Sequence, residues 1–384
     1  MRDVVIVGAG PVGATLALAL RDADLDLVVV DARPPGETMR ADRSLALSHG
    51  ARLILERLGV WTPLSATRGA ITPIVAIDVS QAGGFGSVRL EAAEHRVPAL
   101  GYVVAYRALQ QVLDQALLAR RVDVQFGAAA RGVQGSPDRA VVEIDGQPDA
   151  ALEARLAVIA DGAATPVRGI ERRRHEYGQV AIVANVTLDH PHGGVAYERF
   201  TRDGPVALLP ERDHYGLVWT QTPEQAARTL ALSEADFVAA LRAHFGNRVR
   251  EFTHASGQRS FPLALEVARN TTTTRVAIIG NAAQALHPIA GQGFNLGLRD
   301  AFELARTIVD TPVRRIGDSA MLARYAASRS WDRRAGIALT HGLVRLFGTD
   351  RPLVSVPRGV AMMLLDSMPL AKRTFTRAML FGMR

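Results

Sequence analysis

The sequence predicts an α/β fold in which a domain built on a parallel sheet is interrupted by an antiparallel sheet and followed by C-terminal helices. Three observations lead to this prediction. A glycine-rich strand-to-helix unit opens the chain, strand-like segments follow one another between residues 180 and 220, and a second strand-to-helix unit spans residues 275–310. Strands that alternate with helices indicate a parallel sheet, whereas consecutive strands separated by turns indicate an antiparallel one. Because the second strand-to-helix unit returns to the first domain, the antiparallel sheet interrupts that domain.

The opening unit carries a dinucleotide-binding fingerprint. Val4–Val7 has the composition of a buried strand, the loop Gly8-Ala9-Gly10-Pro11-Val12-Gly13 follows it, and an apolar helix continues to Leu20. In such a loop the first glycine makes the turn, the second admits a pyrophosphate, and the third lets helix and strand pack closely. The next strand, Leu27–Val30, ends at Asp31, which is placed to bind a ribose hydroxyl. The alternative is a glycine-rich turn that binds no nucleotide.

The unit at residues 275–310 has a long loop between its strand, Val276–Ile279, and its helix. After Gly293 the apolar residues recur with a helical period, and Gly291 and Gly293 let a ligand approach the backbone. The start of a helix offers free N–H groups and a partial positive charge. Such a terminus suits an anionic or electron-rich ring edge, such as the N1 and C2-carbonyl edge of a reduced flavin. A tight turn without a ligand is the alternative.

Other segments complete the two domains. Arg43 precedes a helix that stops at Gly59, and it could either contact a phosphate or be solvated. Arg107 stands at the start of another helix, and a strand over Leu156–Ile159 leads into Asp161-Gly162.

Alternating polar and apolar residues predict the antiparallel sheet. The segment 74–90 alternates and is interrupted by a glycine-rich stretch at 83–86, which indicates a hairpin. The further strands are Val180–Leu188, Val195–Phe200, Val206–Leu209 and Tyr215–Thr220. The final fifty residues predict helices broken at Pro352, Pro357 and Pro369.

Composition narrows the class of protein. The chain has 384 residues and no cysteine, which excludes disulfides, thiolate metal sites and CxxC redox chemistry. The net charge is +7, and all but one of the 45 basic residues are arginine. This bias does not by itself indicate nucleic-acid binding, and we expect neither a nucleic-acid partner nor a metal site. No stretch reaches the roughly 18 apolar residues of a membrane span, and the glycines near the N-terminus argue against a signal peptide. We therefore expect a cytoplasmic protein.

The region from Gly342 to the C-terminus is basic and rich in methionine. It holds seven basic and two acidic residues, a surplus of five of the +7 charges. A basic, apolar and adaptable surface suits anionic headgroups, so the sequence predicts a peripheral membrane contact here. The alternative is that these helices merely cover the first domain.

The Gly8–Gly13 loop, Asp161-Gly162 and the stretch 280–300 together resemble the FAD-dependent aromatic hydroxylases of the p-hydroxybenzoate hydroxylase fold. The resemblance covers essentially the whole chain. Asn281, Gln284 and the run 286–295 are similar to the ubiquinone-biosynthesis branch, in which the 2-polyprenyl-6-methoxyphenol hydroxylases are the most similar subgroup.

A second stretch is similar to the same subgroup, Tyr197-Glu198-Arg199-Phe200-Thr201. Two motifs depart from the family pattern. Thr165 replaces a serine, and Ala105-Tyr106 precede Arg107 where Glu-Asn is common.

The resemblance implies a Rossmann-like FAD-binding domain made of residues 1–70, 100–175 and 255–330. It implies a substrate-binding sheet domain made of 71–99 and 176–254, and a C-terminal helical region over 331–384. FAD would be bound non-covalently, with NAD(P)H as a transient reductant because no second glycine fingerprint exists for it. The residues given to the cofactor are Gly8, Gly10, Pro11, Val12, Gly13, Asp31, Arg33, Arg43, Arg107, Asp161, Gly162, Asn281, Pro288, Gly291, Gly293, Phe294 and Asn295.

The activity implied is hydroxylation of a polyprenylated phenol ring in ubiquinone biosynthesis. NAD(P)H reduces the flavin, O2 adds to give a C4a-hydroperoxide, and the terminal oxygen attacks the ring. His287 is the candidate proton acceptor for the phenol, with a packed loop histidine as its alternative reading. The C-terminal region would meet the inner membrane face or a ubiquinone-biosynthesis complex. Alternatives are the same chemistry at another ring position or on a soluble phenol, and an FAD-bound prenyl-lipid carrier that does not hydroxylate.

Overall fold

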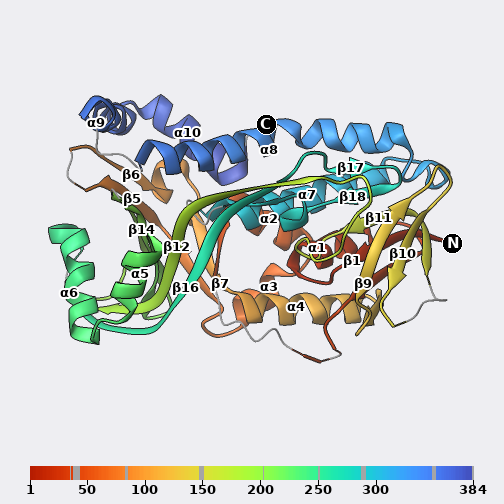
Figure 1. The fold of residues 1–384 in the computed structure, drawn as a ribbon, viewed down its shortest axis with the longest axis horizontal. Helices are drawn as coiled ribbons and strands as arrows, with labels where there is room; N and C mark the ends of the chain where they lie inside the picture. Colours follow the sequence, from red (N-terminus) through yellow and green to blue (C-terminus); the bar gives the residue numbers. More distant parts are fainter. Residues whose placement is uncertain are drawn as a thin grey trace.

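The computed structural model describes residues 1–34, 36–37, 44–82, 85–146, 151–201, 203–249, 251–286, 291–347 and 352–382. Among these residues the strands form two sheets of eight strands and one of three. Figure 1 shows the first sheet at the end of the molecule that holds the N-terminus and the second sheet at the other end. The long helix α8 (Ser319–Phe347) runs along both.

The first sheet is parallel at its centre, which confirms the prediction. β1 (Arg2–Val7) lies between β2 (Leu27–Asp31) and β11 (Leu152–Ile159), and all three run in the same direction. Their valine and isoleucine side chains are buried on both faces, as expected for a parallel sheet. The sheet is completed by β8 (Asp123–Phe126), β9 (Ala130–Gly135), β10 (Ala140–Ile144), β17 (Thr272–Thr273) and β18 (Val276–Ile278).

Three helices cover one face of the first sheet, and their residues share one hydrophobic core with it. They are α1 (Pro11–Leu20), α4 (Tyr106–Ala119) and α7 (Gln292–Val309). The apolar positions that predicted α7 face this core, with Leu298, Ala301 and Leu304 fully buried. The predicted return of the chain to the first domain is therefore confirmed, since β18 pairs with β11 and α7 packs on α1.

The second sheet is antiparallel, as predicted, with one exception. β13 (Val195–Thr201) pairs in parallel with β5 (Ala76–Gln81), because β5 enters the sheet from a separate part of the chain. Its longest strands, β12 (Arg172–Leu188) and β16 (Phe252–Ala268), extend from the first sheet to the far end of the second (Figure 1). The other strands are β6 (Ser87–Glu91), β14 (Gly204–Glu211), β15 (His214–Gln221) and β19 (Gln284–Ala285). Because β12 and β16 continue without a break, the limits given above for the two domains stay a prediction.

Helices α5 (Pro223–Leu230) and α6 (Glu234–Phe245) bury one face of the second sheet against Trp219 and its neighbours. A small sheet joins the two large ones, made of β3 (Ser44–Ser48), β4 (Ile71–Ile74) and β7 (Gly101–Ala105). Beside it lie α2 (His49–Arg57) and α3 (Trp61–Ala66). Short 3-10 turns occur at Ala92–His95, Gly246–Arg248, Gly280–Ala282 and Val313–Arg315.

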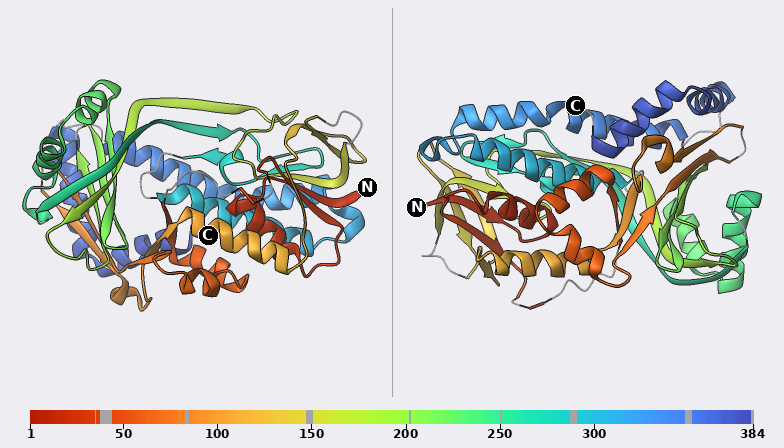
Figure 2. Two further views of the ribbon diagram at one scale, coloured as in Figure 1. Left: turned by 90° about the horizontal axis from the view of Figure 1, so that it is seen from below. Right: turned by 180° about the vertical axis from the view of Figure 1, so that it is seen from behind.

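The C-terminal helices fold back over the second sheet, on the face opposite α5 and α6 (Figure 2). The contacts are close. A Cβ on Gly359 of α9 (Pro352–Ser367) would lie 2.6 Å from the carbonyl oxygen of Phe85, and a Cβ on Gly50 would lie 2.7 Å from that of Leu380 in α10 (Pro369–Phe381). In the part of the chain that the structure describes, no helix is long and apolar enough to cross a membrane.

One predicted helix break is wrong. Pro352 and Pro369 each begin a helix, as expected, but Pro357 lies inside α9. Proline removes one hydrogen bond and crowds the preceding turn. Only one turn of α9 precedes Pro357, so the helix continues through it.

Candidate active site

The glycine loop at the start of α1 has the shape that a pyrophosphate needs. Gly8 has a φ of +101°, and a Cβ on Gly13 would lie 1.9 Å from the Gly8 carbonyl oxygen, so neither position tolerates a side chain. By contrast, no neighbouring atom lies within 4 Å of the place where a Cβ on Gly10 would be. Gly10 is the N-cap of α1, and no side chain caps the helix. Free N–H groups at a helix start, beside open space, fit a bound phosphate.

Asp31 and Arg33 fasten this loop to the sheet. The Asp31 Oδ2 accepts a hydrogen bond from the Ala9 N–H at 2.5 Å, and its Oδ1 accepts from the backbone and side chain of Arg33. Arg33 also pairs with Asp114 of α4. The predicted ribose contact of Asp31 stays a prediction. What the structure adds is that this carboxylate also holds the loop in place.

The Asp161-Gly162 loop closes against the glycine loop. A Cβ on Gly8 would lie 2.8 Å from the Asp161 backbone. The Asp161 carboxylate accepts hydrogen bonds from the N–H groups of Ala163 and Thr165, which fixes the turn that follows β11. The Thr165 hydroxyl donates to the Ala130 carbonyl, so the substitution of threonine for serine keeps a hydroxyl function.

The 280–300 stretch packs against the start of α1, next to the glycine loop. A Cβ on Gly297 would lie 3.0 Å both from the Cα of Gly280 and from a methyl carbon of Val12, so α7, the 280–282 turn and α1 are in close contact. Asn281 is exposed beside them, and Arg107 is exposed at the start of α4. Gly291, with a φ of +58°, is the N-cap of α7, which no side chain caps. Three motifs that are far apart in the sequence therefore meet.

Asn295 has a role that its motif did not reveal. Its Oδ1 accepts from the Ser48 N–H, and its Nδ2 donates to the carbonyl oxygens of Ala46 and Gly291. The side chain therefore ties β3 to the start of α7 and orients that helix terminus. Gly293 and Phe294 lie in the first turn of α7. Arg43, His287 and Pro288 lie outside the described residues.

A buried network of ion pairs and hydrogen bonds supports the 280–300 stretch. Asp300 of α7 accepts hydrogen bonds from the Gly280 N–H, from Gln284 Nε2 at 2.8 Å and from Arg329 Nε at 2.8 Å. Gln284 in turn accepts from Arg333 of α8. Sequence reasoning missed this network because ion pairs between two helices leave no local pattern. Gln284, one of the residues on which the family resemblance rests, is fully buried within it.

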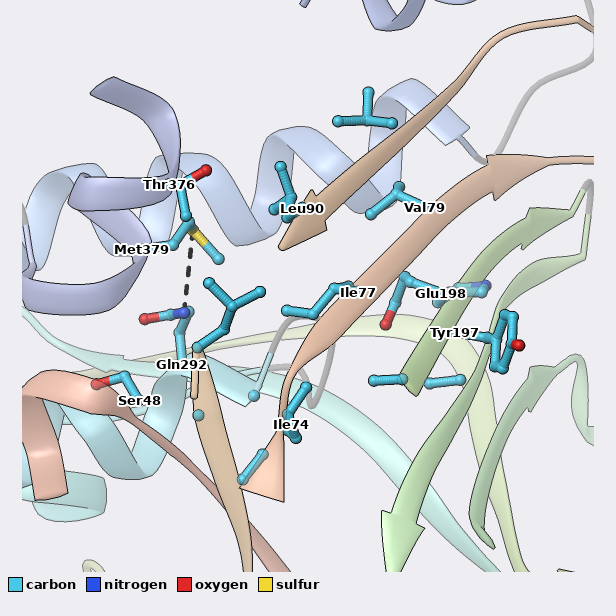
Figure 3. Close-up of a pocket in the computed structure, with 18 of the residues that line it drawn as sticks. Ser48, Ile74, Ile77, Val79, Leu90, Tyr197, Glu198, Gln292, Thr376 and Met379 are labelled. Atoms are coloured by element: carbon cyan, nitrogen blue, oxygen red, sulfur yellow. Dashed lines mark hydrogen bonds between the residues drawn. The ribbon is translucent and has the colours of Figure 1, made fainter. Parts of the chain in front are cut away.

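An apolar pocket of about 390 Å³ opens beside the start of α7 (Figure 3). One wall is the face of the second sheet that points away from α5 and α6, with Ile77 and Val79 of β5 among its residues. Gln292 and Asn295 of α7 line the end nearest the three motifs. The volume lies in the range of about 300–1,000 Å³ that is usual for pockets binding one organic molecule.

The C-terminal helices form the opposite wall of this pocket. Met362 and Leu365 of α9 and Met379 and Leu380 of α10 line it. Gln292 Nε2 donates to the Met379 sulfur at 3.9 Å, which joins α10 to the start of α7 (Figure 3). The predictions for this region were a membrane contact or a contact with a partner complex, with a simple cover of the first domain as the alternative. None of them included a wall of the pocket, because the pattern of one helix does not show which distant surface it will meet.

Glu198 of β13 is the one carboxylate that lines the pocket, within the described part of the chain. Burial raises the pKa of this carboxyl to about 8. In the sequence, Glu198 stands within the stretch Tyr197–Thr201 that is similar to the family, and no role was predicted for it. A usable signal was present, since Glu198 alternates with Ala196 and Phe200, which are buried on the same face of the strand.

The comparisons with known proteins agree with this arrangement. A family model described as an FAD binding domain matches residues 1–335. The ubiquinone hydroxylase UbiL of Rhodospirillum rubrum is 35% identical, over 98% of this chain and 89% of its own. The 3-demethoxyubiquinol 3-hydroxylase of Escherichia coli is 29% identical, over 97% and 96% of the two chains.

Solved structures share the fold at lower sequence identity. The p-nitrophenol 4-monooxygenase of Pseudomonas putida has a TM-score of 0.78 at 17% identity, covering 100% of this chain and 99% of that one. The anhydrotetracycline hydroxylase OxyS of Streptomyces rimosus has a TM-score of 0.70 at 22% identity, covering 99% and 75%. Because the family model spans most of its length and a ubiquinone hydroxylase is 35% identical to it, this chain belongs to the ubiquinone-biosynthesis family of FAD-dependent hydroxylases.

Proposed function

We propose that this protein hydroxylates the ring of a polyprenylated phenol in ubiquinone biosynthesis, with FAD as its cofactor, NAD(P)H as reductant and O2 as co-substrate. The observation that carries the proposal is the apolar pocket at the start of α7, next to the meeting point of the three cofactor motifs. A ring with a hydrocarbon tail matches the aliphatic lining. FAD supplies the redox chemistry and the activation of O2.

The chain's own residues bind and orient the reactants. The Gly8–Gly13 loop would hold the pyrophosphate, and the Asp161 and Asn281 loops would flank the rest of the cofactor. Asn295 orients the terminus of α7 at the end of the pocket. The pocket walls formed by α9 and α10 exclude water from the ring while it reacts.

Product analysis tests this proposal and separates it from its alternatives. Purified protein is incubated with NADH or NADPH, O2 and a set of prenylphenols, with a soluble phenol in parallel. We expect a hydroxylated prenylphenol and phenol-dependent oxidation of the reductant. Hydroxylation of the soluble phenol alone would shift the substrate class. Reductant oxidation that no phenol stimulates, with no product, would favour the prenyl-lipid carrier.

The outer face of α9 and α10 supports a peripheral membrane contact as a further part of the proposal. Large apolar side chains are exposed there, including Met363 at 51%, Leu364 at 49% and Leu370 at 80%. They lie on the same two helices that form a wall of the pocket, so a substrate dissolved in a bilayer would lie close to the pocket when the protein is bound there. Exposed Arg373 and Arg377 would each contribute about 1 kcal/mol near an anionic surface, and salt would weaken that attraction.

Two of the basic residues in the C-terminal region are buried in the structure and are not available to bind lipid headgroups. Arg358 is buried and donates a hydrogen bond to Gln81 inside the protein. Lys372 is buried and pairs with Glu94 at 3.1 Å and with Asp366 at 3.2 Å. We therefore expect exposed apolar side chains to contribute more to membrane binding than charge does.

Flotation with anionic liposomes tests the contact. Deleting the last two helices would also remove a pocket wall, so we choose substitutions on the outer face: Met363→Ser, Leu364→Ser and Leu370→Ser together. We expect a clear loss of floated protein with unchanged FAD content. The control is Leu118→Ser on α4, where an equally exposed leucine (79%) lies on another surface. If the triple variant floats as well as the wild type, this face is not the membrane contact.

A further inference from the structure

Glu198 occupies a position in the second sheet where every cross-strand neighbour is aliphatic. Its cross-strand partners are Val79 of β5 on one side and Ala207 of β14 on the other. The next residues along the same row are Val88 and Val218. All four line the pocket together with Glu198. Neighbours on one face of a sheet determine whether a side chain is stabilised there, and none of these can pair with a carboxylate.

The Glu198 side chain points into the pocket on the side of Ile77 (Figure 3). Part of its surface stays open to the cavity. Among the described residues nothing donates a hydrogen bond to its carboxyl group, and the shift of its pKa has burial as its cause. An apolar side chain would suit this wall better, because a buried carboxyl without a partner is costly. A polar group of the bound ligand that pairs with the carboxyl would therefore explain why a glutamate occupies this position.

The charged groups on the elements packed around the pocket are engaged elsewhere. Arg358 of α9 donates to a glutamine of β5, and Lys372 of α10 is paired with two carboxylates. Asp78 of β5 forms an ion pair with an arginine on the far side of the sheet. Tyr197, next to Glu198 on β13, has its own pKa raised by burial. No cation is therefore held against Glu198 by the described residues.

We infer that Glu198 binds the hydroxyl group of the phenolic substrate and accepts its proton while the ring is oxygenated. The inference rests on the proposed function, since it assigns a residue to that reaction. Glu198 lies on the wall of this pocket of about 390 Å³, so a ring bound inside can bring its hydroxyl group to the carboxyl. The phenol hydroxyl is the acidic group of a substrate whose tail is hydrocarbon, and Glu198 is the one carboxylate that the described residues of the sheet wall offer to it.

The proton transfer is balanced without any redox change at Glu198. The O–H bond of the phenol breaks as an O–H bond of the carboxyl group forms, which leaves electron density on the ring when the electrophilic oxygen arrives. The substituted ring carbon then loses its hydrogen as a proton to solvent, and Glu198 returns the proton that it took from the phenol to the oxygen of the product. General-base assistance of this kind contributes about 10²–10⁴-fold.

The ionised carboxylate is the form that accepts the proton, which determines the sign of the pH dependence. With a pKa of about 8, the ionised fraction rises from pH 7 to pH 9. We therefore expect kcat/KM for hydroxylation to rise over this range with an inflection near pH 8.

The test compares Glu198→Gln, Glu198→Asp and the control Glu224→Gln, which removes an exposed carboxylate on α5. We expect Glu198→Gln to keep its FAD content, to lose about 10²–10⁴-fold in kcat and to lose the inflection. Glu198→Asp should recover part of the rate together with the inflection, and Glu224→Gln should behave as the wild type. A Glu198→Gln variant with the normal rate and the normal inflection would overturn the inference.

Two further measurements keep the inference separate from the proposed function. If the wild type hydroxylates no phenol, the proposed function fails, and equilibrium binding of a prenylphenol between pH 6 and pH 9 then tests Glu198 alone. Binding that changes near pH 8 in the wild type but not in Glu198→Gln supports it, and identical profiles contradict it.

Unfolding by urea checks that the Glu198 carboxyl is buried. The folded-state pKa is raised from 4.5 to about 8, so stability is lost as pH rises through this interval, and Glu198→Gln should be the more stable protein at pH 9.

Discussion

Gly10→Glu is expected to give a folded protein that binds no FAD. A side chain at this position meets no protein atom within 4 Å, and the φ of −61° suits any residue. The same open space is where the pyrophosphate must approach the start of α1, so a carboxylate side chain would block it sterically and repel it. The visible absorbance of bound flavin after gel filtration measures the loss, and circular dichroism reports the fold.

Gly342→Glu is the matched control, because Gly342 in α8 also has open space around its Cβ position and is exposed. It should keep a full complement of FAD. Gly13→Ala is a poor test by comparison, since its Cβ would collide with the Gly8 carbonyl and disturb the loop itself. A folded Gly10→Glu protein with normal flavin content would contradict the placement of the cofactor.

Asp300→Ala is expected to destabilise the protein by about 3–5 kcal/mol, the cost of breaking a buried ion pair by removing one partner. Arg329, which is 7% exposed, would lose one of its two carboxylates, and Gln284 and the Gly280 N–H would lose their shared acceptor. The free energy of unfolding in urea measures the effect. FAD affinity should fall as well, because Gly280 begins the turn that carries Asn281.

Arg306→Ala on the same helix is the control for this prediction. Its ion pair with Glu303 is exposed at the arginine, which has 63% of its side chain in solvent, and such pairs contribute at most about 1 kcal/mol. If Asp300→Ala costs no more than Arg306→Ala, the buried network does not hold the 280–300 stretch in place.

The elements of both sheets could be predicted because their signals are local. The strand at β1, the glycine loop and α1 follow one another within twenty residues, and each is determined by its own composition and period. The antiparallel strands were found by alternation in the same way. Pro357 shows the limit of such rules, because whether a proline ends a helix depends on how much helix precedes it and on what the next turns pack against.

The features of the site can be separated in the same way, into those with a local sequence signal and those that depend on distant segments. By itself, the sequence determined the cofactor class, the three motifs and the positions of their glycines, since a loop that admits a phosphate must have small residues at fixed spacing. The tertiary structure decided which surfaces meet. It placed α9 and α10 as a wall of the pocket, made Asn295 and Asp300 supports of α7, and surrounded Glu198 with aliphatic neighbours. The physical reason is that packing and burial arise between segments far apart in the chain, and a residue's pKa and partners depend on those neighbours.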